Sequence, residues 1–210
     1  MNAAAVYAKL LAANVPVLRT SEAAAVLSLS PVAASQALRR LGAVGLVRRL
    51  RHGLTWVSHA PIDPWVVLEY LSAPYPAYGS LYSALYLHGV LSQVPQMHFA
   101  VTLGRTQRIR TRVGTYSLHQ MAPELFGGFE TLDSGAKLAT VEKALFDLAY
   151  LAATRSRLFT RPPELELPRC FNRAVLSGWT ERITAARRQV QVRARLRELL
   201  PATGAASFSR

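Results

Sequence analysis

Apolar residues recur at helical spacing three times in the first part of the chain. The first helix is predicted over residues 3–13, with Leu11 among its inward positions. A second helix is predicted over residues 21–28. Thr20 before it suits an N-cap, and Glu22 lies in its first turn, where the helix dipole favours an acid. Its alanines allow a neighbouring helix to come close.

A third helix is predicted to begin at Pro31. Ser30 before it is a good N-cap, and proline fits the first helical position because its missing N–H costs nothing there. The expected buried stripe consists of Ala34, Ala37 or Leu38, and Leu41. The outward positions are Val32, Ala33, Ser35, Gln36, Arg39 and Arg40. Short or hydrogen-bonding side chains therefore come first along the outer face, and cations follow.

Two β-prone runs, 46–50 and 54–57, then flank the sequence Arg51-His52-Gly53, where glycine suits a turn. Three helices followed by a hairpin with a cationic tip predict a winged helix–turn–helix over residues 1–60. Ser28 stands where many such turns carry glycine. The whole chain is expected to be α+β, with this N-terminal domain followed by a mixed α/β domain that ends in basic helices.

The residue types on these elements are those that contact DNA. Ser35 and Gln36 can hydrogen-bond to base edges, and Arg39 can reach either guanine or phosphate. The expected phosphate contacts are Arg40, Arg48, Arg49, Arg51 and His52, with Ser30 at the helix start. An ordinary solvated basic face would explain Arg39 and Arg40, but it does not explain the arginines of the hairpin.

Charge is concentrated at the two ends of the 210-residue chain, whose net charge is +13. Residues 1–60 hold seven basic residues and one acid, 61–154 hold six and seven, and 155–210 hold twelve and four. Such clustering favours a polyanionic partner, because each neutralised phosphate releases counterions. Codon bias toward arginine is the other explanation, since most of the bases are arginine.

In the middle of the chain, helices are predicted over residues 65–71 and 80–91. Tyr78, Tyr82 and Tyr86 are spaced as one helical stripe, which indicates core or a domain interface rather than a base-stacking platform. Strands are predicted at "MHFAVTLG", "GTYSLHQM", "FGGFETL" and "AKLAT", with the basic "RTQRIRTR" as a connection. Thr140 is expected to cap a helix in which Lys143 and Asp147 form an i,i+4 pair.

The segments "YPAYGSLYSALYLHGVLSQVP" (75–95) and "LATVEKALFDLAY" (138–150), on either side of a strand pair, resemble the AbiEi family of antitoxins. The resemblance covers residues 15–155. Family members often have proline before Glu-Lys, whereas this chain has Thr-Val-Glu-Lys. The resemblance implies a winged N-terminal domain, autorepression at inverted-repeat double-stranded DNA, and a type IV toxin–antitoxin system linked to phage defence. It also implies a nucleotidyltransferase-like toxin as functional partner, with or without direct contact.

The last part of the chain is predicted to contain helices over 169–176 and 180–200, after a proline-broken connector. Ile183, Val190, Leu196 and Leu199 or Leu200 form an imperfect apolar stripe on the second. A secondary basic surface lies beside it: Arg182, Arg187, Arg188, Arg193, Arg195 and Arg197. A solvated face, a second contact to the DNA backbone, and docking to an acidic partner or RNA remain alternatives. The antitoxin-like domain is expected to span residues 61–200, with a disordered tail at 201–210.

An enzyme is not expected. Residues 70–123 contain no Asp or Glu, so a two-metal nuclease or nucleotidyltransferase site lacks its carboxylates there. No phosphate-loop, HExxH or GxSxG motif occurs. Neither a cofactor nor a metal is predicted, because the five histidines have no ligand spacing and Cys170 stands alone.

The single cysteine and the lack of a long apolar run predict a cytoplasmic protein without a membrane partner. The function expected is that of a DNA-binding autorepressor and antitoxin. The alternative is a winged-helix transcriptional regulator, unconnected with toxins, whose middle domain senses a ligand or a partner.

Overall fold

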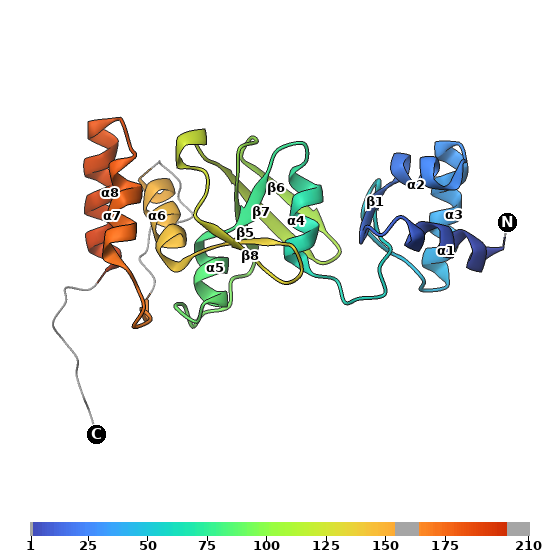
Figure 1. The fold of residues 1–210 in the computed structure, drawn as a ribbon, viewed down its shortest axis with the longest axis horizontal. Coiled ribbons are helices and arrows are strands. Elements are labelled where there is room, and N and C mark those ends of the chain that lie inside the picture. The colour runs from blue at the N-terminus through green and yellow to red at the C-terminus, as the bar shows by residue number, and fades with distance from the viewer. Residues whose placement is uncertain (1, 154–163, 201–210) are drawn as a thin grey trace, which may run out of the picture.

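The computed structural model describes residues 2–153 and 164–200, which form an elongated α+β molecule. Figure 1 shows three parts along its long axis: an N-terminal unit, a central sheet with its helices, and a group of helices at the far end. The predicted connector at 154–163 and tail at 201–210 lie outside the described residues.

The N-terminal unit contains the three predicted helices and the predicted hairpin. Its elements are α1 (Ala3–Ala12), β1 (Val17–Arg19), α2 (Thr20–Leu27), α3 (Pro31–Ala43), β2 (Arg48–Arg51) and β3 (Leu54–Trp56). Thr20 had been predicted as the N-cap of α2, but the N-cap is Arg19. The backbone N–H of Arg19 donates to the carboxylate of Glu22 at 2.7 Å, so the first-turn acid caps the helix in place of the threonine.

Strand β1 was not predicted, and it turns the hairpin into a three-stranded sheet of order β1-β3-β2. Both pairs are antiparallel, and Val17 lies opposite Trp56. A three-residue strand is too short to show alternation of apolar and polar positions. Only its pairing with β3 identifies it.

The central sheet has six strands in the order β6-β7-β5-β4-β9-β8. Its strands are β4 (Ala77–Gly79), β5 (His98–Thr102), β6 (Gln107–Thr111), β7 (Gly114–Gln120), β8 (Phe129–Thr131) and β9 (Lys137–Ala139). The pairs β4–β9 and β5–β7 are parallel, and the others are antiparallel. The accompanying helices are α4 (Pro64–Ser72), α5 (Leu81–Leu87) and the short 3-10 helix η1 (Pro123–Leu125).

Two expectations for this region were wrong. The basic segment predicted as a connection forms strand β6. Tyr78 lies in strand β4 and not on a helix, so the three tyrosines do not form one helical stripe. Tyr78 is fully buried and Tyr82 packs edge-to-face on Phe99, whereas Tyr86 is exposed.

The remaining helices are α6 (Val141–Ala152), α7 (Arg173–Glu181) and α8 (Ala186–Leu199). Thr140 caps α6, as predicted, by accepting a hydrogen bond from the Lys143 N–H. The boundary between α7 and α8 falls later than predicted, and the predicted apolar stripe of α8 was partly wrong. Val190 is 65% exposed, whereas Val192 is fully buried. Val192 shares a face with Leu196 and Leu199, at i, i+4 and i+7, and Val190 lies off that face.

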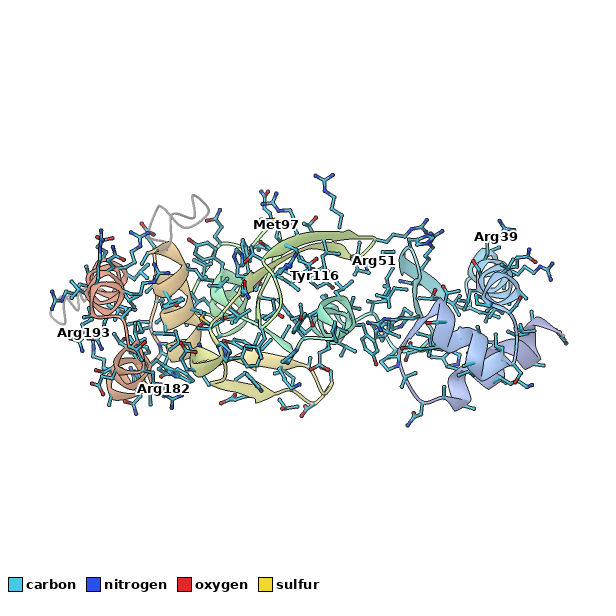
Figure 2. The ribbon with its side chains drawn as sticks, turned by 90° about the horizontal axis from the view of Figure 1, so that it is seen from above. Arg39, Arg51, Met97, Tyr116, Arg182 and Arg193 are labelled. Carbon is cyan, nitrogen blue, oxygen red and sulfur yellow. The ribbon has the colours of Figure 1, made fainter. Side chains whose placement is uncertain are left out.

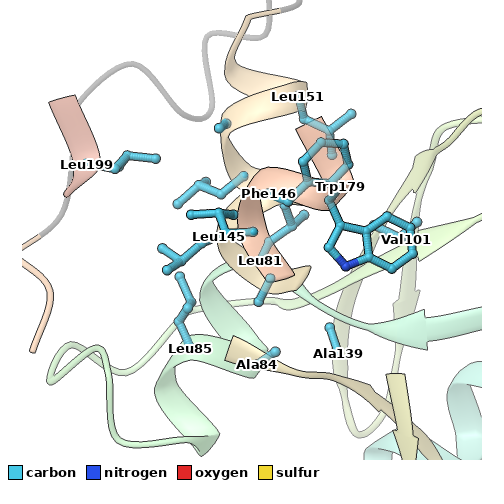
Figure 3. Close-up of a cluster of buried hydrophobic side chains, with 14 of the residues drawn as sticks. Leu81, Ala84, Leu85, Val101, Ala139, Leu145, Phe146, Leu151, Trp179 and Leu199 are labelled. Atoms are coloured by element: carbon cyan, nitrogen blue, oxygen red, sulfur yellow. The ribbon is translucent and has the colours of Figure 1, made fainter. Parts of the chain in front are cut away.

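Three groups of buried apolar side chains form the interior. One lies among the N-terminal helices, and the largest joins α5, α6, α7 and α8, where Leu145, Phe146 and Trp179 pack together (Figure 3). The third joins the N-terminal sheet to the central sheet, with Trp56 and Tyr116 in one cluster. Within the described residues, no helix is both long enough and apolar enough to cross a membrane.

Candidate nucleic-acid interface

Helix α3 presents a polar and cationic outer face. The hydroxyl of Ser30 accepts a hydrogen bond from the Ala33 N–H at 3.3 Å, and this cap fixes where the helix starts. Ala34, Leu38 and Leu41 are buried as predicted, which fixes the rotation of the helix. The predicted contact residues of this helix are all exposed: Ser35, Gln36, Arg39 and Arg40.

The turn between α2 and α3 is tight because Ser28 adopts a left-handed conformation, with φ 53° and ψ 45°. This is the position at which many helix–turn–helix motifs carry glycine. The Ser28 N–H bonds to the Ala25 carbonyl, and the Leu29 N–H bonds to that of Ala24. The last turn of α2 is thereby closed, and the chain leaves it directly for the start of α3.

The hairpin of β2 and β3 carries the second group of cations. Leu50 points into the core, while Arg48, Arg49 and Arg51 are exposed along the same strand. The register with β3 shifts between Arg49 and Arg51, and these two side chains are exposed on either side of the buried Leu50. Gly53, with φ 72°, supplies the left-handed turn residue.

The polar side chains of the hairpin are in contact with one another. A guanidinium nitrogen of Arg49 lies 3.2 Å from Nδ1 of His52. The Nε–H of Arg49 also donates to the carbonyl of Arg51 at 3.4 Å. Glu22 is the one acid among residues 1–60, and its carboxylate is engaged at the start of α2. Among the described residues, no ion pair involves an arginine of the hairpin.

The two groups belong to one small unit. Leu38 and Leu41 of α3 pack in the same apolar cluster as Val47, which immediately precedes β2. In Figure 2, Arg39 lies on the outer part of this unit and Arg51 lies where the unit meets the central sheet. All nine predicted contact residues are thus exposed on one unit, although the hydroxyl of Ser30 also serves as a helix cap.

Arg19 was missed by sequence reasoning. It is exposed at the end of β1, and it lines a pocket of about 150 Å³ together with Arg51 and His52. The other side of this pocket is formed by α4, through Tyr70 and Leu71. No local signal marks Arg19, because its position depends on the pairing of β1 with β3.

The secondary basic surface divides into two kinds of arginine. Arg182 stacks on Trp179, with 4.1 Å from the guanidinium carbon to the ring centroid, and Arg188 stacks on Tyr150 at 4.8 Å. Arg195 forms an ion pair with Glu198. The exposed remainder on α8 consists of Arg187, Arg193 and Arg197. Arg182 and Arg193 lie at the opposite end of the molecule from Arg39 (Figure 2), so this surface is separate from the N-terminal one.

A buried polar cluster lies between the central sheet and α6. The Lys143 ammonium donates to Asp147 and to the Leu125 carbonyl, and Asp147 also accepts hydrogen bonds from Ser80 at 2.7 Å and Tyr78 at 3.1 Å. Burial raises the pKa of the Asp147 carboxyl, against the effect of these donors, which favour its charged form. Lys143 and Asp147 are both 0% exposed, so no substrate reaches them in this conformation. The cluster holds elements together and is not a site open to solvent.

The described residues contain no group of three His, Cys, Asp or Glu side chains that could hold a metal ion. Comparison with known proteins adds no relative: neither a scan against models of protein families nor a search of the curated proteins finds a match. The candidate interface therefore rests on the positions and charges of its own residues.

Proposed function

We propose that the protein is a sequence-specific DNA-binding transcriptional regulator whose N-terminal unit acts as a winged helix–turn–helix. In this proposal α2 and α3 form the helix–turn–helix, α3 enters the major groove, and the β2–β3 hairpin is the wing. One observation carries it. A helix with an exposed polar face and a hairpin with exposed arginines lie in one small unit, with one acid in the first sixty residues. Val47 and Val57, at the two ends of the hairpin, pack in the same apolar cluster as α3.

Each contact has a physical basis. Ser35 and Gln36 are short enough to let the start of α3 approach the base edges, and both can donate and accept hydrogen bonds. Arg39 lies one turn further along and serves a base or a phosphate. The positive end of the helix dipole at the start of α3 also favours a phosphate. The remaining contact residues bind the DNA backbone: Arg40, Arg48, Arg49, Arg51 and His52.

We also propose that the regulator is an antitoxin of the AbiEi type, which represses its own operon from inverted repeats and counteracts a nucleotidyltransferase-like toxin. Support comes from the two segments that carry the resemblance. In the fold they are adjacent: β4 pairs with β9, the Ser80 hydroxyl bonds to Asp147, and His88 bonds to the Ala139 carbonyl at 2.8 Å. Their joint occurrence thus has a structural reason, since each completes the buried surface of the other.

The test of DNA binding is fluorescence anisotropy on the DNA upstream of the protein's own gene, against a scrambled duplex, at two salt concentrations. We expect a preference of about 10³ or more that persists at the higher salt. Equal and steeply salt-dependent binding to both duplexes would overturn the claim of a specific operator.

The antitoxin claim is tested by co-expressing the full chain with the nucleotidyltransferase-like toxin that the proposal places in the same operon. We expect growth to be rescued both by the wild type and by a Gln36→Ala/Arg39→Ala variant that has lost operator binding, because neutralisation is assigned to residues 61–200. Rescue by neither protein would contradict the toxin link. A reproducible thermal shift with a small molecule would then favour a ligand-sensing regulator.

A further inference from the structure

A second row of exposed arginines lies on strand β6, outside the N-terminal unit. Arg108 and Arg110 lie on one face of this strand, opposite Ser117 and Thr115 of β7. Ile109 points the other way, into the core beside Tyr116. Arg105 before the strand and Arg112 after it are also exposed. Four cations therefore follow a single edge strand, with alternate residues about 6.8 Å apart.

Among the described residues, no ion pair joins an acid to this row. The sequence has no Asp or Glu between Glu69 and Glu124. Within the parts of the chain that the structure describes, the ion pairs join Lys137 to Glu69, Lys143 to Asp147 and Arg195 to Glu198, and none involves β6. Like charges at this spacing repel one another, and a polyanion would remove that repulsion.

The row on β6 is continuous with the hairpin. The Arg112 N–H donates to the Leu50 carbonyl at 2.9 Å, so the end of β6 lies directly beside β2. Leu50 is flanked in sequence by Arg49 and Arg51, both exposed. Ile109 and Leu50 belong to the same buried cluster, which fixes β6 against the N-terminal unit. The exposed arginines of the hairpin and of β6 thus lie on neighbouring strands of the two sheets.

We propose that β6 extends the DNA-binding surface, with Arg105, Arg108, Arg110 and Arg112 bound to duplex backbone that flanks the sequence read by α3. This inference rests on the proposed function, since the hairpin places β6 beside the DNA. The contacts are to phosphates, because the exposed guanidinium groups lie on a sheet edge and not on an element that enters a groove. They lengthen the bound duplex and add affinity without sequence preference.

Charged side chains on an edge strand also prevent it from pairing with another copy of the chain. Arg108 and Arg110 fulfil that role within the strand. The role does not require Arg105 and Arg112, which lie outside the strand, nor the alignment of the row with the hairpin arginines. The experiment separates protection of the edge from DNA binding.

Anisotropy is measured over a salt series on the upstream duplex, on the same duplex shortened by about one helical turn at each end, and on a scrambled duplex. We expect Arg108→Gln/Arg110→Gln to weaken binding to the long duplexes on the order of tenfold and to lower the salt slope by about 1.8, at about 0.9 per phosphate contact. On the shortened duplex, the Arg108→Gln/Arg110→Gln variant should have the same affinity and salt slope as the wild type. Arg108→Lys/Arg110→Lys keeps both charges and should keep the slope.

The matched control, Arg169→Gln/Arg173→Gln, removes two exposed charges elsewhere and should leave the slope unchanged. A β6 variant that equals the wild type on the long duplex, or a control that loses as much slope, would overturn the inference. Equal binding of the wild type to upstream and scrambled DNA would overturn the proposed specificity instead. In that case the slope comparison still decides whether β6 touches the backbone.

Discussion

Lys143 and Asp147 form an ion pair across one turn of α6, 2.5 Å apart, with both side chains fully buried. The ammonium also lies over the rings of Phe146 and Trp179, at 4.7 Å and 4.5 Å from their centroids. The pair joins the start of α5 to α6 through Ser80 and connects η1 to the same helix through Leu125. Its depth makes it sensitive to the loss of either partner.

Asp147→Asn is expected to lower the free energy of unfolding by about 3–5 kcal/mol, because it leaves the Lys143 ammonium buried without a counter-charge. The double variant Lys143→Met/Asp147→Asn removes both charges and should recover most of this loss. Urea denaturation measures both. The surface pair Lys137–Glu69 is the control, and Lys137→Met should cost no more than about 1 kcal/mol. A double variant as unstable as the single one would show that charge is not the cause.

His119 makes stability depend on pH. Burial, with a smaller effect of the positive charge of Arg108, lowers the pKa of His119 from 6.5 to about 4. Between these values the unfolded chain binds a proton that the folded chain does not. We therefore expect the free energy of unfolding to fall by up to about 3 kcal/mol as the pH drops through this window.

Urea denaturation at pH values above and inside the window checks this dependence. His119→Gln should remove most of this pH dependence. The pH dependence that remains is assigned to His98, because burial also lowers the pKa of His98. His52→Gln is the control, because His52 is exposed on the hairpin. An unchanged slope in His119→Gln would contradict the assignment.

Gly128 allows a close approach of Trp179. Its φ is +68°, and a Cβ there would lie 2.6 Å from the indole ring and 3.0 Å from the Lys143 side chain. Gly45 has a similar φ of +77° but nothing within 4 Å of its Cβ position. Gly45→Ala should cost about 1 kcal/mol from backbone strain, and Gly128→Ala about 1–3 kcal/mol more from the clash. If thermal denaturation gives equal losses of stability for Gly45→Ala and Gly128→Ala, the side chains around Gly128 can move aside without loss of stability.

Gln36 and Arg51 are expected to differ in what they contribute to DNA binding. Gln36→Ala should reduce the preference for the upstream duplex by about 1–3 kcal/mol and leave binding to scrambled DNA unchanged. Arg51→Ala should weaken both duplexes alike and lower the salt slope by about 0.9. Anisotropy on the two duplexes distinguishes them. Equal losses on both duplexes for Gln36→Ala would remove it from the reading role.

The sequence by itself determined the elements that carry local signals. Ser30 followed by Pro31 fixed the start of α3, Thr140 fixed that of α6, and Gly53 marked the turn of the hairpin. Caps and turn residues act through backbone groups a few positions away, so their effect is visible in a short stretch of sequence. The exposed face of α3 followed from the same local periodicity.

The tertiary structure alone decided what depends on distant partners. Strands β1 and β4 are identified by pairing with strands far along the chain, because three residues carry too little pattern of their own. Strand β6 is identified by its hairpin pairing with the adjacent β7. The predicted pair of Lys143 and Asp147 was correct, but its burial comes from Trp179 and the central sheet packing over it. The place of Arg112 beside Leu50 likewise arises only when two sheets meet. Burial and pairing energies belong to contacts between segments, and the linear sequence does not display which segments those are.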